Sequence, residues 1–169
     1  MRVVLIMTTT ADGFISKDPS DPAVFAHGYD ELFFSEKTLE IGTVVMGLNA
    51  YRLLPHPFDG RLNIVMSTSP NVAEGIPGTL EFFSGSPQEL IDSLEKRGIS
   101  ELAVIGGGQV NASFLVEGLV DEIYLTIAPH LFGQGLSLAS GFDLDMSLKL
   151  VDERRLGENA VLLHYEVVK

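Results

Sequence analysis

The sequence predicts one α/β domain, built on a largely parallel sheet that is covered by helices on both faces. Over the first two thirds of the chain, short apolar runs alternate with stretches of helical periodicity, the pattern of strands joined by crossover helices. The runs are almost continuously apolar, which is typical of strands buried on both faces. With 169 residues, 46% apolar and 20% charged, the chain is long enough for one full core.

Eight segments have the length and composition of strands. Six are short, mainly apolar runs: Val3–Met7, Thr43–Met46, Asn63–Met66, Leu102–Ile105, Glu122–Ile127 and Ala160–Val168. Two weaker ones are Thr79–Phe83 and Leu148–Arg154. From Asp121 onward the strands have no helix between them, so we expect an antiparallel edge or hairpin there.

Three helices are expected between the strands. The first covers Tyr29–Leu39 and the third covers Gln109–Glu117. The second has the clearest start, because Ser86 can act as N-cap, a proline follows it, and Glu89 completes a capping box. Gly98 ends this helix. Surface connections rich in proline, glycine and aspartate are expected at Lys17–Pro22, Pro55–Gly60 and Pro70–Gly78.

Composition excludes several classes of partner and chemistry. The chain carries 11 Lys and Arg against 23 Asp and Glu, a net charge of −12, which repels phosphate backbones and anionic lipids. We therefore expect no nucleic-acid and no membrane partner. Without cysteine there are no disulfides, thiolate nucleophiles or cysteine zinc sites. The run at residues 3–7 is too short for a signal core or a membrane span, so we expect a cytoplasmic protein.

A glycine-rich turn is the strongest local feature. A buried run leads into three glycines and then a helix; the segment is Ile105, Gly106, Gly107, Gly108, Gln109 and Val110. Glycine lets the backbone approach a ligand closely, and a helix N-terminus offers free N–H groups to a phosphate. The alternative is a tight turn that needs glycine for steric reasons alone. The spacing is not a Rossmann fingerprint, because Asn111 stands where another small residue is required.

Two weaker signals lie earlier in the chain. Gly47 ends a strand, at the edge where open α/β sheets place ligands. Thr8 and the turn dipeptide Asp12-Gly13 follow the first strand. Each of these is equally compatible with an ordinary turn. The histidines His27, His56, His130 and His164 are scattered without metal-ligand spacing, so no metal site is expected.

The order of these segments resembles a known family. In sequence order they are Asp12-Gly13, Met46-Gly47, Ile105 to Gly108, Asp121-Glu122-Ile123 with Pro129, and Gly133-x-Gly135. Over nearly all of its length the chain is similar to the dihydrofolate-reductase-like superfamily, and within it to free-standing relatives of the riboflavin-biosynthesis reductase (RibD C-terminal) domain. The resemblance implies a dihydrofolate-reductase-like fold, a mixed, mainly parallel sheet of about eight strands with flanking helices. It also implies one domain over residues 1–169, without an attached deaminase domain.

The same resemblance implies reduction of a small heterocyclic or ribosylated substrate by hydride from NADPH, often in a homodimer. The triple-glycine turn would face the cofactor pyrophosphate, with Gly47 at a second cofactor-side turn. The residues expected to contact the cofactor are Gly47, Leu48, Ser67, Ile105, Gly106, Gly107, Gly108, Gln109 and Val110.

On the substrate side, Thr126 resembles a family threonine that hydrogen-bonds to the carboxylate partner of the substrate. The folate-reducing branch has an acid on its first helix, where Asp30 and Glu31 fall; the spacing from Gly47 favours Glu31. In a pocket such a carboxyl has a raised pKa and can relay a proton. The alternative is a solvated helix N-terminus. The expected catalytic residues are Glu31, Thr126 and Thr8, and the expected substrate contacts are Asp12, Asp30 and Phe34.

The chain departs from the family where the cofactor's 2′-phosphate is usually bound. Leu48 stands where arginine is usual, Ala50 where threonine is common, and Thr68 where a basic residue is usual. Bidentate arginine is the usual partner of such a phosphate. Three alternatives follow: an NADH user, an NADPH user anchored by Arg52 or Arg61, or a protein that no longer uses a nicotinamide.

Two functions therefore stay open. One is an NAD(P)H-dependent reductase acting on a small pterin-like or pyrimidine-like molecule. The other is a non-catalytic nucleotide- or ligand-binding protein on the same fold. A homodimer is expected from the family and from a positive mean hydropathy of +0.25.

Overall fold

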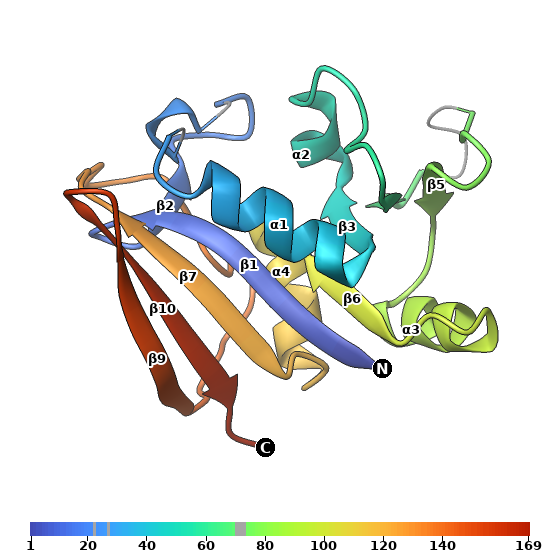
Figure 1. The fold of residues 1–169 in the computed structure, drawn as a ribbon. Helices are drawn as coiled ribbons and strands as arrows, with labels where there is room; N and C mark the ends of the chain where they lie inside the picture. The colour runs from blue at the N-terminus through green and yellow to red at the C-terminus, as the bar shows by residue number, and fades with distance from the viewer. Residues whose placement is uncertain (22, 27, 70–73) are drawn as a thin grey trace.

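A computed structural model describes residues 1–21, 23–26, 28–69 and 74–169 (Figure 1). Pro22 and residues 70–73, which belong to two of the expected surface loops, lie outside the described residues, as does His27. An eight-stranded sheet has the order β5-β4-β3-β6-β1-β7-β10-β9. Its strands are β1 (Arg2–Thr10), β3 (Thr43–Gly47), β4 (Leu62–Met66), β5 (Leu80–Phe83), β6 (Glu101–Val104), β7 (Glu122–Ala128), β9 (Leu148–Leu156) and β10 (Ala160–Val167).

The direction of the strands confirms the expected mixed sheet. Every neighbouring pair from β5 through β7 is parallel, whereas β10 pairs antiparallel with both β7 and β9. The last third of the chain therefore forms the expected hairpin. A small second sheet pairs β2 (Phe14–Ser16) with β8 (Leu136–Ser137), and periodicity did not predict it because both strands are so short.

Helices cover both faces of the sheet, as the continuous apolar runs predict. The helices are α1 (Glu31–Ile41), α2 (Leu48–Arg52), α3 (Pro87–Lys96) and α4 (Gly108–Val116), with a 3₁₀ turn at Val24–Ala26. On β1, Val3 and Leu5 belong to one buried cluster with residues of α3 and α4. Val4 and Ile6 point the other way, into a cluster with residues of α1 and α2. Alternation along one central strand thus separates the two layers.

The helix boundaries follow from their caps. The predicted capping box of α3 is present, since the Ser86 hydroxyl accepts from the Glu89 N–H and the Glu89 carboxylate accepts from the Ser86 N–H. Helix α1 begins two residues later than expected, because Asp30 takes the N-cap position with non-helical backbone angles. Across the described part of the chain, no helix is long and apolar enough to cross a membrane.

Candidate active site

The two glycine turns lie side by side, at the carboxyl ends of neighbouring parallel strands. Gly47 ends β3, and its N–H donates to the carbonyl of Gly106 over 2.8 Å. The N–H of Ile105 donates to the carbonyl of Val45 over 3.0 Å. Ser67 follows β4, whose last residue pairs with Gly47. The sequence-predicted cofactor residues are therefore brought together on one edge of the sheet.

At three of these glycines the fold itself disfavours a side chain. A Cβ on Gly47 would lie 3.1 Å from the Val110 side chain. Gly106 has a φ of +111°, which L-residues rarely adopt. A Cβ on Gly108 would lie 2.7 Å from the carbonyl oxygen of Ser137. The steric alternative thus accounts for these positions without a ligand.

Gly107 is different, because no neighbouring atom would obstruct a side chain at this position. A Cβ there would meet no described atom within 4 Å, and its φ of −76° is open to any residue. Gly107 is the N-cap of α4, and within the described ranges no side chain caps this helix. The N–H groups of the first turn and the positive end of the helix dipole therefore have no side-chain partner among the described residues.

Only one side of this helix N-terminus is open. On the other side, Asn111 Nδ2 donates to the carbonyl of Leu138 over 2.8 Å, and the N–H of Ser140 donates to the carbonyl of Gly108 over 3.2 Å. Segment 138–140 is thus fixed against α4. The residues present fit a dinucleotide pyrophosphate, which would lie over Gly107, where the backbone is bare.

Replacing Gly108 with Ala should destabilise the fold itself. The new Cβ would be forced against the Ser137 carbonyl, so segment 138–140 must move away from α4. We expect a loss of about 1–3 kcal/mol in the free energy of unfolding, as for other overpacked sites. Urea denaturation followed by circular dichroism measures it; an unchanged midpoint would show that segment 138–140 yields freely.

Basic side chains near the glycine turns are few. Leu48 packs against the buried cluster on the face of the sheet that α1 and α2 cover, and Thr68 is exposed. Arg61 is held elsewhere, because its guanidinium donates to the Thr38 hydroxyl over 2.6 Å and burial lowers its pKa. Arg52 ends α2, is exposed, and has no bonded side-chain partner among the described residues. Of the two proposed anchors for a 2′-phosphate, the structure leaves Arg52 available.

A carboxyl group and two threonines form the second half of the site. Thr8 of β1 and Thr126 of β7 are opposite each other in the parallel register. The Thr8 hydroxyl donates to Asp30 Oδ2. Asp30 is an N-cap residue, yet its side chain does not cap α1 and turns to the threonines instead. This choice places a carboxyl over the sheet, at the carboxyl ends of β1 and β7.

The environment of Asp30 favours its protonated form. Burial raises the pKa of the Asp30 carboxyl, and hydrogen bonds from the hydroxyls of Thr8 and Thr126 oppose that rise. Thr126 is 1% exposed, so the hydroxyl pair is held rigidly by the sheet. A carboxyl that holds its proton above the usual pH range can donate it to a bound molecule.

Of the two acids that spacing from Gly47 left side by side, with Glu31 preferred, the structure brings Asp30 to the threonines. Glu31 is exposed, and its carboxylate accepts from the N–H of Gly28 over 3.2 Å. Glu31 is the first residue of α1 and makes no described contact with the threonines, whereas the N-cap residue Asp30 bonds to Thr8. Spacing from Gly47 could not distinguish two adjacent residues, because one residue of rotation about a helix start changes the face completely.

Two other predicted substrate residues lie in different surroundings. The Asp12 carboxylate accepts from the Thr10 hydroxyl and from the N–H groups of Phe132 and Gly133, which lowers its pKa. It fastens the loop after β1 to the loop after β7. Phe34 packs against Phe58, with ring centroids 5.5 Å apart. The structure thus joins neither side chain to the Asp30 cluster.

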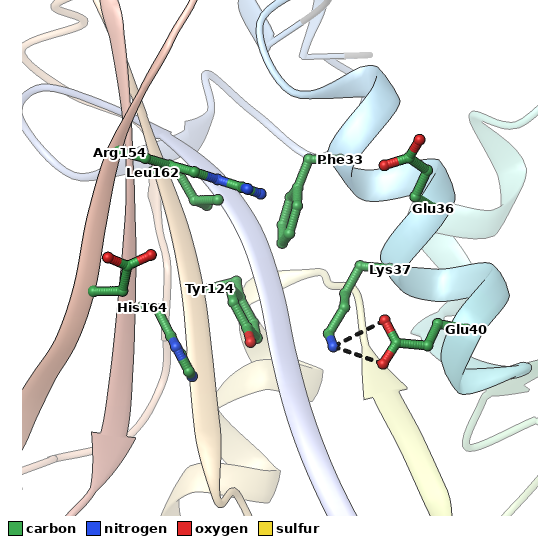
Figure 2. A pocket seen from close by; sticks show the side chains of 9 residues that line it. Phe33, Glu36, Lys37, Glu40, Tyr124, Arg154, Leu162 and His164 are labelled. Atoms are coloured by element: carbon green, nitrogen blue, oxygen red, sulfur yellow. Dashed lines mark hydrogen bonds and ion pairs between the residues drawn. The ribbon is translucent and has the colours of Figure 1, made fainter.

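A cavity that the sequence did not predict lies between α1 and strands β7, β10 and β9 (Figure 2). Its volume is about 310 Å³, and it is lined by Phe33, Glu36, Lys37, Glu40, Tyr124, Asp152, Arg154, Leu162 and His164. The sequence held one signal for it: side chains alternate along a strand, so Tyr124 lies on the same face of β7 as the predicted site residue Thr126.

The cavity is lined by side chains of both charges. Arg154 lies over the ring of Phe33 at 4.9 Å, and Lys37 lies over the ring of Tyr124 at 5.5 Å (Figure 2). Lys37 is also paired with Glu40 at 3.1 Å. Because three acids face these two cations, the cavity does not select an anion by charge. In the part of the chain that the structure covers, no three metal-ligand side chains come together.

Comparisons with known proteins identify a family by a domain model and a fold by solved structures. The model of the RibD C-terminal domain matches residues 2–162. The uncharacterized protein YwjB of Bacillus subtilis is 25% identical over 97% of both chains. A putative riboflavin biosynthesis protein of Shewanella has the same fold, with a TM-score of 0.83 and 22% identity over all of both chains.

A bifunctional protein of Thermotoga maritima has this fold in part of its chain. It is described as a diaminohydroxyphosphoribosylaminopyrimidine deaminase/5-amino-6-(5-phosphoribosylamino)uracil reductase. Its TM-score is 0.79 at 20% identity, and the match covers 99% of this chain and 56% of the other.

Proposed function

Because the chain belongs to the RibD C-terminal domain family, we propose that it is a reductase that transfers hydride from a nicotinamide cofactor to a small heterocyclic or ribosylated substrate. The family and the fold of its neighbours support a riboflavin-pathway reductase-like domain. The observation that supports hydride transfer to a bound substrate is the half-buried Asp30 carboxyl. It is held by two threonine hydroxyls at the same sheet edge as the glycine turns.

The cofactor side of the reaction is a matter of binding and orientation. A bound nicotinamide dinucleotide supplies the hydride. The N-terminus of α4 at Gly107 would hold its pyrophosphate, and Gly47 leaves room for the Val110 side chain of α4. Strand β1, which carries Thr8, lies directly beside β6, which leads into the triple-glycine turn, so the glycine turns and the Asp30 cluster lie on neighbouring strands. That arrangement suits a cofactor and a substrate that meet over the end of β1.

On the substrate side, the protein moves a proton. Reduction of a C=N or C=O group by hydride leaves a negative nitrogen or oxygen that must be protonated. Asp30 would donate that proton from its carboxyl and would be reprotonated from solvent. Thr8 and Thr126 would fix the orientation of the carboxyl through their hydroxyl groups.

A thermal-shift titration tests the cofactor half of the proposal. A ligand that binds only the native state stabilises it by mass action, so the unfolding temperature rises. At a ligand concentration of a hundred times Kd, the free energy of unfolding increases by about 2.7 kcal/mol. We expect a rise with NADPH or NADH, followed by loss of nicotinamide absorbance when a ribosylaminopyrimidine phosphate or a dihydropterin is added. Absence of a shift with both cofactors would exclude the reductase.

Arg52 provides a test of cofactor choice. If it binds the 2′-phosphate, Arg52→Ala should weaken NADPH binding about tenfold, the size of one charge-assisted hydrogen bond, and leave NADH binding unchanged. Isothermal titration with both cofactors measures the two constants. Lys96→Ala, at the exposed end of α3, is the matched control. Equal binding of NADPH to both variants would assign the phosphate to another group or to no group.

A second candidate is a non-catalytic nucleotide- or ligand-binding protein. Leu48 and Thr68 favour it, since the side chains beside the glycine turns carry no charge for a 2′-phosphate. Nucleotide binding without turnover of any pterin or pyrimidine would support this candidate. Turnover would exclude it.

A further inference from the structure

The cavity beside α1 has a floor of two rows of side chains that cross strands β7, β10 and β9. In each row the residues are paired in register, so their side chains point to the same face of the sheet, toward α1. The first row is Tyr124, His164 and Asp152, and the second row is Thr126, Leu162 and Arg154. The second row ends at the threonine that holds Asp30, so the cavity adjoins the Asp30 cluster.

Stacking and hydrogen bonds fix the aromatic part of this floor. The rings of Tyr124 and His164 are stacked, with centroids 4.2 Å apart and an angle of 8° between their planes. His164 Nε2 is hydrogen-bonded to a carboxylate oxygen of Glu122 over 2.8 Å, and Arg2 Nε donates to the same carboxylate over 2.7 Å. A ligand that enters the cavity therefore meets a surface that is already ordered, which lowers the entropic cost of binding.

Helix α1 supplies the opposite wall of the cavity. Phe33 and Lys37 lie one helical turn apart, and both line the cavity. The Phe33 and Tyr124 ring centroids are 5.3 Å apart, and Leu162, which is 3% exposed, completes an apolar interior (Figure 2). The volume of about 310 Å³ is within the usual range for small-molecule sites. The interior is thus suited to the apolar part of a small ligand.

Two opposite charges on strand β9 lie at the open side of the cavity. Asp152 and Arg154 are both exposed, and their Cα atoms are about 7 Å apart, because they are two residues apart along one strand. Neither forms an ion pair among the described residues. The Arg154 guanidinium lies over the ring of Phe33 at 4.9 Å (Figure 2). The cavity therefore offers a ligand one carboxylate and one guanidinium for charge-assisted hydrogen bonds.

The combination of charges determines the kind of ligand. A ligand with only a negative charge would bind Arg154 but would lie close to Asp152, and a ligand with only a positive charge would meet the reverse conflict. Glu36, Lys37 and Glu40 add both signs on the side of α1, where Lys37 is already paired with Glu40 at 3.1 Å. A small zwitterion with an apolar body is complementary to both charges and to the aromatic interior.

We propose that this cavity binds a free α-amino acid with an apolar or aromatic side chain. Arg154 would bind its carboxylate and Asp152 its ammonium group, while its side chain would pack on Phe33, Tyr124 and Leu162. No glycine of the cofactor-side turns lines this cavity. The proposal is therefore independent of the reductase function.

Three probes with the same phenyl body test the requirement for both charges. They are L-phenylalanine, phenethylamine, which lacks the carboxylate, and 3-phenylpropionate, which lacks the ammonium group. Titrations followed by heteronuclear NMR measure each dissociation constant. We expect L-phenylalanine to bind about tenfold more tightly than either analogue, since each analogue loses one charge-assisted hydrogen bond. Either analogue binding as tightly as L-phenylalanine, or no binding of L-phenylalanine, would overturn the proposal.

Single substitutions on β9 test the location of the site. Arg154→Gln should weaken the binding of L-phenylalanine and 3-phenylpropionate about tenfold without weakening that of phenethylamine. Asp152→Asn should weaken the binding of L-phenylalanine and phenethylamine by a similar factor without weakening that of 3-phenylpropionate. Unchanged binding of L-phenylalanine in either variant would overturn the assignment to this cavity.

Arg155→Gln and Glu153→Gln are the matched controls. They remove the same two charges from the same strand, but from its other face. All four side chains are exposed, so we expect the circular dichroism spectrum of the wild type in each variant. Both controls should bind L-phenylalanine as the wild type does. An equal loss of affinity in a control and in its partner variant would show a general effect of charge and would also overturn the site.

Discussion

Replacing Asp30 with Asn should lower kcat at least a hundredfold while the protein stays folded. The amide keeps the shape of the carboxyl and can still accept from the Thr8 hydroxyl, but it cannot supply a proton. Positioned proton transfer contributes about 10²–10⁴-fold to catalysis. Steady-state kinetics with the best substrate found for the wild type measures the loss, and cofactor binding should be unchanged.

The same substitution should change how stability depends on pH. Burial raises the pKa of Asp30 in the folded state, so the folded protein holds this proton more tightly than the unfolded chain does. The stability gained from protonation is complete below the unfolded pKa, about 3.9, and is lost as pH rises through the folded pKa. Asp30→Asn has no proton to lose at this position, so its stability does not fall as pH rises through that pKa. Above the folded pKa, the variant should therefore unfold at a higher temperature than the wild type.

Glu31→Gln is the control for both effects. It neutralises the adjacent residue, which is exposed and lies away from the threonines, so kcat should change less than twofold. If Glu31→Gln lost activity and Asp30→Asn kept it, the catalytic assignment would return to Glu31. If both variants kept full activity, neither carboxyl would be the proton donor.

Replacing Gly107 with Val should abolish the thermal shift with nicotinamide cofactors in a protein that still folds. The φ of −76° is common to L-residues and the new side chain meets no described atom within 4 Å, so the fold has room for it. The isopropyl group would occupy the open space over the first turn of α4. We expect cofactor affinity to fall more than tenfold, because the pyrophosphate can no longer reach the N–H groups.

Gly107→Ala is the graded companion to this variant. Its single methyl group should weaken binding less than valine does, while both variants unfold at the same temperature. Titration calorimetry on the wild type, Gly107→Ala and Gly107→Val measures the cofactor affinity of each. An undiminished affinity in Gly107→Val would move the cofactor away from this turn.

The sequence predicts the sheet well, because its strands are buried on both faces and give continuous apolar runs. Strand β6 and its triple-glycine turn were found in this way. Sequence could not separate the glycines by role, since Gly107 differs from Gly108 only in what surrounds it in space. It also could not choose between Asp30 and Glu31, because the choice depends on the residue at which α1 begins. The cavity beside α1 depends on the register of β7, β10 and β9, which no local pattern gives.

The order of the strands has a consequence for how the chain reaches this structure. Strand β1 lies in the middle of the sheet, yet its neighbours are β6 and β7: Arg2 pairs with Glu101 and Val4 pairs with Glu122. Contacts between residues so far apart in sequence slow folding, because a long loop must close before they form. During synthesis the first strand has no sheet neighbour until most of the chain has been made. Thr8 and Thr126 therefore come together late, and the proton-donating cluster is assembled only when the centre of the sheet closes.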